Sequence, residues 1–514
     1  MTRENQANQP NGQSQAAGER KLIEDRLAKT VEIRSRGLDP YPPRFNRTHT
    51  SVEAVALFQS LEEGGRESDH SDSHNVRVAG RVMARRGQGK ASFIDVRDGH
   101  GSIQIFARQN TMGDESYAIL DLLDIGDIIG IEGVVIRTRR GEISVEAKTI
   151  TLLTKAIRPL PDKWHGLQDQ EVRFRQRYLD LISNEKAMQN ALLRTKIVRS
   201  MRDFMHARGF IEVETPILVP VAGGAQATPF ATHHNQLNRD LYLRIATELY
   251  LKKLIVGGIE RVFEIGRLFR NEGLDHDHNP EFTTIESYQA YADYNDVMCM
   301  VEEMIAQIAQ DTTGSMILPA ISEKRPEINL TPPWPRLDLR SEIMKRTGID
   351  FVETRDIESL SKAMQECGIH VEPGSDWGRL LDKVISSEVE PNLIQPHFLI
   401  DYPVEMSPLA KRKPGSSDIV ERFEAFVMGT ELANAFTELN DPVDQRERFE
   451  QQERLREEFD NDEADRLDED FLIAIEHGMP PTGGLGLGID RLTMLVAGEE
   501  SIREILLFPA MRNI

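Results

Sequence analysis

The sequence predicts an α+β protein in which a small β-barrel precedes a larger region of helices and antiparallel strands. Five short β segments separated by Gly- or Asp-bearing turns lie between Asn75 and Leu153. Further along, two alternating segments, Val262 to Arg270 and Glu281 to Gln289, flank a polar loop that ends in Asn279-Pro280, which is typical of an antiparallel hairpin. At 514 residues the chain is long enough for about two to four domains.

Composition indicates a globular protein of a reducing, cytoplasmic compartment. Hydrophobic residues make up 39% of the chain, and its two cysteines, Cys299 and Cys367, form neither a disulfide framework nor a metal-ligand pattern. The polar N-terminus is expected to be neither a signal peptide nor a membrane anchor. No uncharged apolar run approaches the roughly 18 to 20 residues of a membrane span, so no membrane partner is expected.

The net charge of −22 argues against indiscriminate nucleic-acid binding. The distribution of charge is more informative than the total. The densest acid lies in one run, Glu447 to Asp470, with the spacing of a solvated helix. Basic residues cluster near the start of the β-rich segment, at Arg77, Arg81, Arg85, Arg86 and Lys90.

Composition and periodicity divide the chain into successive parts. Residues 1–18 are rich in Gln, Asn, Gly and Ala and are expected to form a disordered tail. Residues 19–65 contain a helical pattern from Glu19 to Arg36. Residues 66–155 hold the five strands, a count that fits an OB-type barrel. Such barrels bind single-stranded nucleic acid in many proteins and serve other purposes in others.

A charged linker over residues 156–183 precedes a C-terminal domain over 184–514. This domain begins with a long amphipathic helix, Asn184 to Arg208. A strand at Leu241 to Ala246 leads into a helix from Glu248, and a further helix, Asn295 to Gln310, follows the central hairpin. Residues 312–400 carry several short helical patterns and are interpreted as an insertion.

The second strand of the central hairpin has a polar face. Period two places Phe282, Thr284, Glu286 and Tyr288 on one side, and Arg270 closes the first strand beside the loop. An arginine can grip phosphate with two hydrogen bonds and an aromatic ring can stack on a base, so this face predicts a nucleotide site. The alternative is an amphipathic hairpin whose polar face only meets water.

A second acidic cluster lies in Phe423 to Asp441. If the segment is a strand, Asn434, Phe436 and Glu438 share a face, but Glu431 has the opposite parity, so a bulge must intervene if all four serve one site. Helical spacing would also align Glu431, Asn434 and Glu438. Both interpretations stay open at this point.

Three motifs occur along the C-terminal domain. GFIEVETPIL at Gly209 to Leu218, FRNEG followed by HNPEFT, and GLGLGIDRLTML at Gly484 to Leu495 resemble motifs 1, 2 and 3 of the class II aminoacyl-tRNA synthetases, in the form carried by bacterial-type lysyl-tRNA synthetases. The resemblance also includes Arg158 to Ile182 and Gly80 to Phe106. It therefore covers nearly the whole chain after the N-terminal tail.

The resemblance implies an anticodon-binding OB-fold and a class II catalytic domain with an antiparallel sheet flanked by helices. It implies ATP-dependent activation of L-lysine to lysyl-adenylate, and transfer of the lysyl group to the 3′ end of tRNA(Lys), with AMP and diphosphate as products. Mg²⁺ is the implied cofactor. The helix and strand of the first motif are the implied interface of a homodimer.

The resemblance also implies the residues that bind ATP, of which Arg270 and Arg491 are the catalytic pair. The others around the nucleotide are Glu272, His278, Asn279 and Phe282. Glu424 and Glu431 would hold Mg²⁺ against the triphosphate, as hard oxygen ligands should.

For lysine, a cationic side chain in a partly desolvated pocket needs carboxylate partners, because an unpaired buried charge is very costly. By resemblance Glu438 with Tyr288 meets the ε-ammonium, and Glu248 and Glu286 serve the amino groups. The full set implied for lysine is Gly224, Glu248, Arg270, Glu286, Tyr288, Asn434, Phe436 and Glu438.

In the barrel, Phe93 and Phe106 are candidates to stack on unpaired anticodon bases, Gln104 to bind a uridine edge, and Arg81 to lie near the RNA backbone. The alternative is that both Phe residues belong to the barrel core, which is the more common fate of a Phe in an alternating strand. Parity does not separate these interpretations, because Gln104 and Phe106 share a face.

Other functions compete with lysine–tRNA ligation. The run Gly484, Gly486, Gly488 lacks the third glycine of a dinucleotide fingerprint, which disfavours a Rossmann site. A synthetase for aspartate or asparagine is one alternative, although a site that binds the anionic aspartate would need Arg or Lys in place of the carboxylates. A non-catalytic, nucleic-acid-binding protein on a synthetase scaffold is another, and it would not need the triphosphate-binding set. Related ligases that modify a protein lysine lack the N-terminal barrel.

Thr228 stands where many relatives have Arg, which removes one expected positive charge.

Overall fold

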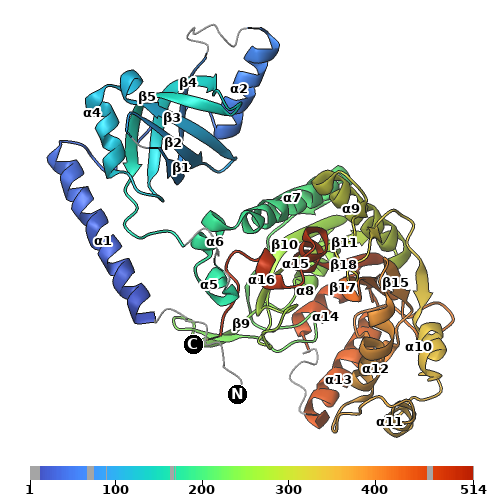
Figure 1. The fold of residues 1–514 in the computed structure, drawn as a ribbon. Coiled ribbons are helices and arrows are strands. Elements are labelled where there is room, and N and C mark those ends of the chain that lie inside the picture. The colour runs from blue at the N-terminus through green and yellow to red at the C-terminus, as the bar shows by residue number, and fades with distance from the viewer. Residues whose placement is uncertain are drawn as a thin grey trace, which may run out of the picture. The chain divides into compact units, whose positions relative to one another are not determined.

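The computed structural model describes residues 12–65, 74–87, 89–161, 167, 169–459 and 467–512. The chain divides into two units, Met1–Gly166 and Leu167–Ile514 (Figure 1). Each unit has its own hydrophobic core. Among the described residues, no helix has the length and apolar character needed to cross a membrane.

A closed five-stranded barrel forms the body of the first unit and confirms the predicted β segments. Neighbouring strands follow the order β1-β2-β3-β5-β4. Ile94, Val96 and Ile105 point inward and are buried, because successive side chains of a strand alternate between the interior and the exterior of the barrel. The strands are β1 (Asn75–Arg86), β2 (Ala91–Arg97), β3 (Ser102–Arg108), β4 (Ile128–Arg137) and β5 (Ile143–Thr154).

Helices surround this barrel. α1 (Gly12–Ser35) begins before the expected Glu19, because the Gln- and Ala-rich residues that precede it are good helix formers. Residues 1–11 of the expected tail lie outside the described residues. Arg26 of α1 donates to the backbone carbonyls of Ile125 and Ala156, which ties the helix to the barrel. The other helices of this unit are α2 (Ser51–Glu63), α3 (Gln109–Met112), α4 (Asp114–Tyr117) and the 3₁₀ turn η2 (Ala118–Leu122).

An eight-stranded sheet is the centre of the second unit, in the order β14-β15-β16-β17-β18-β11-β10-β6. The predicted hairpin is present as β10 and β11. Only the β6–β10 and β14–β15 pairs of this sheet are parallel. The strands are β6 (Ile211–Glu212), β10 (Arg261–Phe269), β11 (Glu281–Ala290), β14 (Arg336–Asp338), β15 (His397–Ile400), β16 (Arg422–Val427), β17 (Thr430–Thr437) and β18 (Thr482–Gly488).

The two faces of this sheet have different roles. The helices α7 (Glu185–Ala207), α9 (Tyr294–Thr313) and α15 (Ile489–Ala497) pack on one face (Figure 1). Ile285 and Leu485 belong to the core beneath them. Residues of the opposite parity, such as Glu286 and Gly484, face a cavity on the other side.

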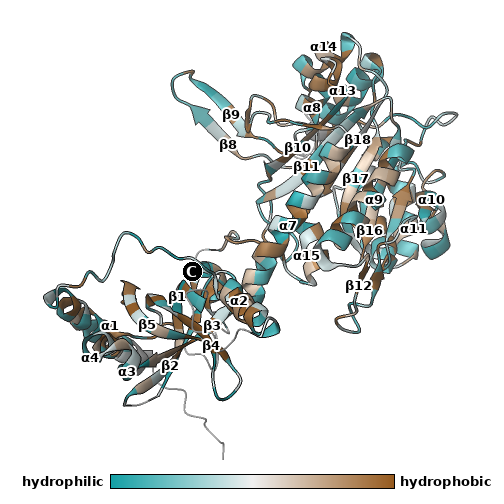
Figure 2. Ribbon diagram, turned by 90° about the horizontal axis from the view of Figure 1, so that it is seen from above, coloured by the Kyte–Doolittle hydropathy of each residue, from teal (hydrophilic) through white to brown (hydrophobic). Residues whose placement is uncertain are grey.

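Further elements frame the cavity. α8 (Glu248–Val256) packs against β10 and β11. A mostly hydrophilic hairpin of β8 (Ala231–His234) and β9 (Arg239–Leu243) projects from the unit, with β7 (Leu218–Val219) paired to β9 (Figure 2). Short helices α5 (Gln170–Arg175), α6 (Arg177–Ser183) and α16 (Ile502–Ile505) complete this part.

The helices of the segment between α9 and β16 fold around a core of their own, whereas its strands β12 (Ile317–Leu318) and β13 (Ile328–Asn329) pack into the main core. The segment also contains α10 (Leu339–Thr347), α11 (Ile357–Glu366), α12 (Trp377–Val384) and the short turns η3 (Ile385–Val389), η4 (Glu390–Asn392) and η5 (Val404–Met406).

The acidic run expected as one solvated helix is divided. α13 (Pro442–Phe459) takes its first part, residues 460–466 lie outside the described residues, and α14 (Glu469–Glu476) begins at its end. Gln445, Arg448 and Phe449 of α13 are buried, so this helix also packs on the protein.

Candidate active site and barrel surface

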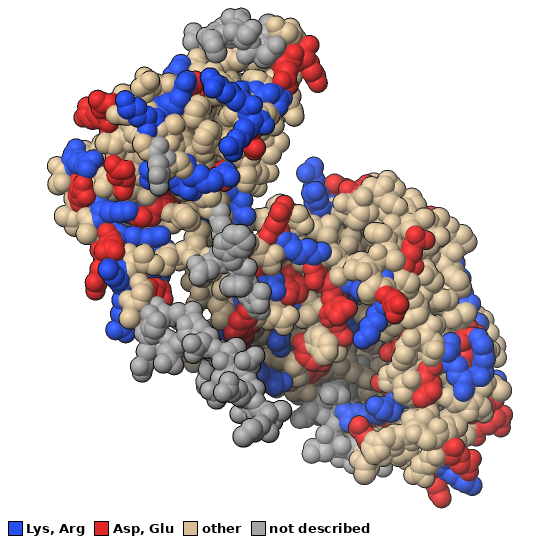
Figure 3. Space-filling view, in the orientation of Figure 1, with Lys and Arg blue, Asp and Glu red and all other residues tan. Residues whose placement is uncertain are grey.

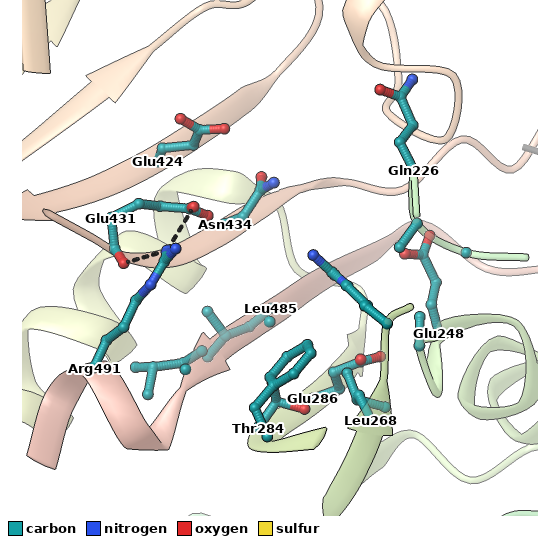
Figure 4. A pocket seen from close by; sticks show the side chains of 18 of the residues that line it. Gln226, Glu248, Leu268, Thr284, Glu286, Glu424, Glu431, Asn434, Leu485 and Arg491 are labelled. Atoms are coloured by element: carbon teal, nitrogen blue, oxygen red, sulfur yellow. Dashed lines mark hydrogen bonds and ion pairs between the residues drawn. The ribbon is translucent and has the colours of Figure 1, made fainter. Parts of the chain in front are cut away.

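A cavity of about 440 Å³ opens on the face of the sheet opposite α7, α9 and α15 (Figure 4). Every residue predicted for ATP, lysine or Mg²⁺ lines it: Gly224, Glu248, Arg270, Glu272, His278, Asn279, Phe282, Glu286, Tyr288, Glu424, Glu431, Asn434, Phe436, Glu438 and Arg491. The structure therefore brings the second and third sequence motifs and the acidic segment together around one space, whereas no residue of the first motif, Gly209 to Leu218, lines it.

The floor of the cavity is made by β11, β18 and β17 in register. Gly486 lies between Glu286 and Asn434, and Gly484 lies between Tyr288 and Phe436. A Cβ added at Gly484 would approach Glu438 Oε1 to 1.7 Å. The glycine run thus gives its neighbours room, which is the use of glycine where groups approach the backbone closely.

A bulge in β17 decides between the two interpretations of the acidic segment. Ala433 pairs with Ala425 and Glu431 pairs with Phe426, so Leu432 is an extra residue on β17. The bulge restores Glu431 to the cavity side despite its parity. The strand interpretation is confirmed, and the helical alternative is wrong.

Three buried carboxylates gather at one end of the cavity, those of Glu248, Glu286 and Glu438. The backbone N–H of Thr247, at the start of α8, donates to both oxygens of Glu286 at 3.1 and 3.2 Å. Burial, reinforced by the charge of Glu248, raises the pKa of Glu286 to about 7. This end of the cavity is strongly suited to a cation.

Arg270 lies between this acidic end and the rest of the cavity. Its guanidinium is 5.1 Å from the ring centroid of Phe282. Its Nε is buried and has no hydrogen-bond partner among the described residues. Burial lowers the pKa of Arg270, but a guanidinium stays charged at neutral pH. A partly buried cation with an unused donor is prepared for an anionic ligand.

Arg491, the second predicted catalytic residue, joins two predicted neighbours. Its Nη1 donates to the carboxylate and the backbone carbonyl of Glu431 at 3.1 and 3.0 Å, as the dashed lines in Figure 4 show. Its Nη2 lies 3.3 Å from Nε2 of His278. The Nδ1 of His278 is in turn 2.8 Å from Asp275. The cation is therefore held at the opposite wall from Glu248.

The two predicted metal ligands lie on adjacent strands of one hairpin, Glu424 on β16 and Glu431 on β17. Glu424 accepts hydrogen bonds from Arg422 at 2.6 Å and from Tyr402 at 2.8 Å. Burial raises the pKa of Glu424 to about 7. Among the described residues no cluster of three or more Asp, Glu, His or Cys side chains could hold a metal by itself. Two carboxylates fit Mg²⁺ if phosphates complete the coordination, as is usual for this ion.

Asn279 and Thr228 each contact backbone groups of neighbouring segments. The amide of Asn279 donates to the carbonyl of Glu281 and accepts from the N–H of Ala510, so its polar atoms brace the loop. The carbonyl of Thr228 accepts from the N–H of Asn271 at 2.8 Å. The loop with the unusual Thr is thus joined to the central hairpin without a side-chain charge.

Sequence reasoning missed several residues that shape this site. Arg422 donates to Asn434, Glu424 and the carbonyl of Met406. The alternation of Arg422 with Glu424 on β16 was the available signal. Arg448 of α13 donates to the carbonyls of Ser407 and Ala410, which belong to the cavity wall. Lys252, on α8, was also missed, although it follows Glu248 by one helical turn.

The barrel presents a second candidate site on its outer surface. Phe93 and Phe106 are half-buried and face outward, with ring centroids 4.6 Å apart and planes at 10°. Arg108 lies 5.2 Å from the centroid of Phe106. Neither Phe belongs to the barrel core, so the core interpretation is wrong.

Gln104 lies on the same face and accepts a hydrogen bond from Ser144. Arg81 donates to the carbonyl of Gly126 at 2.7 Å, and burial lowers its pKa. Figure 3 shows many Lys and Arg side chains on the visible face of this unit. Exposed basic residues of the strands and their loops include Arg85, Arg86, Lys90 and Arg108.

Comparison with known proteins agrees with this geometry. Residues 169–512 match the family described as tRNA synthetases class II (D, K and N), and residues 76–153 match the OB-fold nucleic acid binding domain. Three similar curated proteins are each called lysine–tRNA ligase. That of Dehalococcoides mccartyi is 52% identical, covering 96% of this chain and 97% of its own. That of Carboxydothermus hydrogenoformans is 50% identical over 96% and 98% of the two chains, and that of Staphylococcus epidermidis is 50% identical over 95% and 98%.

Proposed function

The chain belongs to the class II tRNA synthetases, and we propose that it activates L-lysine with ATP and transfers the lysyl group to the 3′ end of tRNA(Lys). The family covers enzymes for aspartate, lysine and asparagine, so the choice among them comes from the site and from the relatives. The single observation that carries it is the buried trio Glu248, Glu286 and Glu438. Three carboxylates bind a cationic amino acid and repel an aspartate.

The first step is an attack by the carboxylate of lysine on the α-phosphorus of ATP, with diphosphate as the leaving group. Arg270 serves this step because its free donor and its charge can bridge the two anions and hold them in line. Phe282 offers a flat ring for the adenine, and Arg491 takes the outer phosphates. No protein nucleophile is needed, so the work of the site is positioning and charge neutralisation.

We assign Glu424 and Glu431 to Mg²⁺. The ion, when bound, would neutralise charge on the triphosphate. Arg422 and Tyr402 hold Glu424, and Arg491 holds Glu431, so both carboxylates are oriented by neighbours in the free protein. Such support is what fixes metal ligands in place.

The barrel is assigned to the anticodon. Phe93 and Phe106 form an outward aromatic surface beside Gln104, and single-stranded bases stack on such surfaces. The nearby arginines supply positive charge for the RNA backbone, although the chain as a whole has a negative net charge.

A homodimer is assigned to the surface of the first motif. Apolar side chains are exposed along α7 and the strands that follow it, at Leu192, Ile211, Ile217 and Leu218. Exposed apolar side chains on these consecutive segments support an interface there. Sedimentation equilibrium should give the mass of two chains, and a monomer at micromolar concentration would contradict this assignment. We propose a cytoplasmic location for the enzyme, because the charging of tRNA serves translation.

The test of the function is charging of a tRNA(Lys) transcript with labelled L-lysine in the presence of ATP and Mg²⁺. We expect lysyl-tRNA to accumulate and to be lost on mild alkaline treatment, which cleaves the ester. A tRNA(Asp) transcript with labelled aspartate is the control. Aspartyl-tRNA formation without lysyl-tRNA formation would overturn the proposal.

A further inference from the structure

A fully buried lysine lies behind the acidic end of the cavity. Lys252 comes from α8, its side chain has an exposed fraction of 0%, and it does not line the cavity. Its ammonium contacts Glu248 Oε1 at 2.5 Å and Oε2 of Glu438. The two carboxylates therefore face a cation of the protein on one side and the cavity on the other.

Aromatic rings enclose the ammonium of Lys252. It lies 5.5 Å from the ring centroid of Phe436, 5.8 Å from that of Phe471 and 6.0 Å from that of Tyr288. Cations within about 6 Å of a ring face are attracted to it. Two of these rings, Tyr288 and Phe436, also line the cavity, so they separate Lys252 from any ligand there.

Lys252 stays charged although it is desolvated. Burial alone would lower its pKa, but the attraction of Glu248 and Glu438 outweighs burial and the pKa is raised. For Glu438, burial raises the pKa well above its ordinary value, and Lys252 is the largest influence in the opposite direction. The other ionisable neighbours are Glu286 and Tyr288 on β11, and Arg422 on β16 acts on Glu248.

The charges of this region match the proposed substrate. When all three carboxyls are ionised, Glu248, Glu286 and Glu438 supply three negative charges, and Lys252 offsets one of them. Free lysine carries two ammonium groups, and its carboxylate is taken by Arg270. The two ammonium groups then neutralise the two remaining negative charges, because unpaired charges in a buried site are costly.

The contact with Lys252 also orients Glu438. Oε2 is turned toward Lys252, and Oε1 has no hydrogen-bond partner among the described residues. Oε1 lies over the backbone of Gly484, in the floor of the cavity. One oxygen is thus fixed by the protein and the other is free for a ligand.

We propose that Lys252 is a positioning and specificity-determining residue: a resident cation that orients Glu438 and sets the net charge of the pocket to suit two ammonium groups. This inference rests on the proposed lysine activation. Without Lys252, one of the buried carboxyls takes up a proton, which the incoming ammonium must displace, and Glu438 loses its fixed orientation.

The test compares Lys252→Met with wild type and with Lys253→Met in lysine-dependent ATP–pyrophosphate exchange. Lys253 is the next residue of α8, but it pairs with Asp470 on the surface at 2.5 Å, so its variant controls for changes to the helix. We expect Lys252→Met to raise the KM for lysine about tenfold or more, with kcat and the KM for ATP within about threefold of wild type, because a ground-state binding interaction is lost.

Two readouts separate this role from a merely structural one. The KM for lysine of the variant, divided by that of the wild type, should fall toward one as the pH rises from about 7 to about 9. The reason is that the carboxyl that takes up a proton in the variant loses it again at higher pH. Lys252→Arg keeps the charge and should recover part of the affinity. Lys252→Gln, which keeps a donor without charge, takes the place of the Met variant if the Met variant does not fold by circular dichroism.

Several results would overturn the role of Lys252. The first is an unchanged KM for lysine in a folded Met or Gln variant. The second is an equal rise in the KM for lysine and the KM for ATP together with a lowered Tm. The third is a variant to wild-type ratio of the KM for lysine that does not change with pH. Absence of lysine-dependent exchange in the wild-type enzyme would instead refute the proposed function, so the two failures are distinguishable.

Discussion

Glu438 and Gly484 fit together so closely that a side chain at position 484 would require Glu438 to move: a Cβ there would lie 1.7 Å from Glu438 Oε1 and 2.7 Å from Tyr288 Cε1. Gly484→Ala should therefore displace the carboxylate and raise the KM for lysine about tenfold or more, since an interaction of at least about 1.4 kcal/mol is lost. Gly486→Ala is the comparison, because its Cβ would meet no atom closer than 3.8 Å. Equal effects of both variants on the KM for lysine would contradict the close fit.

Arg270→Ala should slow adenylate formation. Its partly buried guanidinium lies beside Phe282, and charge develops around phosphorus during the proposed reaction. We expect kcat for pyrophosphate exchange to fall by about 100-fold or more, as for loss of one pre-organised donor. Arg261→Ala, at the exposed far end of the same strand, should leave the rate unchanged. Wild-type exchange in Arg270→Ala would make Arg270 structural.

Glu431→Gln should weaken the use of Mg²⁺. The variant loses one charged oxygen ligand, and we expect the Mg²⁺ concentration for half-maximal exchange to rise about tenfold, which corresponds to about 1.4 kcal/mol. Titration at saturating ATP and lysine measures this shift. Glu281→Gln, an exposed carboxylate on β11, is the control. Identical titrations for Glu431→Gln and wild type would remove Glu431 from the metal site.

Lysine affinity should depend on pH through Glu286. Its pKa of about 7 in the free protein means that the carboxyl is neutral below pH 7 and charged above it. Ammonium binding favours the charged form, so affinity should fall as the pH drops through 7, by up to about tenfold per pH unit for one proton. Calorimetric titration with L-lysine measures this. Glu286→Gln should bind lysine more weakly and lose this slope, and a slope unchanged in the variant would assign it to another group.

The outward stack of Phe93 on Phe106 predicts separate effects on the two half-reactions. Phe93→Ala should raise the KM for tRNA(Lys) about tenfold, since stacking contributes roughly 1 to 3 kcal/mol per base. Lysine-dependent pyrophosphate exchange needs no anticodon and should be nearly unchanged. Ile94→Ala, in the barrel core, is the control for lost stability. If Phe93→Ala lowered Tm and both activities together, Phe93 would be a structural residue.

Much of this fold follows from the sequence because its patterns are local. The barrel strands and the central hairpin have period-two alternation, and turn residues separate them, so both were predicted with their approximate boundaries. The motif residues around Arg270 and Arg491 were placed by resemblance, and the structure gathers them around one cavity.

The remainder depended on contacts between distant segments. Parity left the place of Glu431 open, and only the pairing of β17 with β16 shows that Leu432 bulges. Parity also could not say which face of the barrel holds Phe93, since closure of the barrel decides it. Lys252 follows Glu248 with the spacing of an ordinary surface ion pair, and only the packing of Phe436 and Phe471 shows that it is buried.

Selectivity for lysine is proposed to come from the three buried carboxylates of Glu248, Glu286 and Glu438. It is tested most directly by ATP–pyrophosphate exchange with each of the twenty amino acids supplied singly. We expect strong exchange with L-lysine and only background exchange with aspartate, asparagine and the neutral amino acids, because only lysine brings two ammonium groups of the right reach. Exchange that is stronger with aspartate or asparagine than with lysine would contradict it.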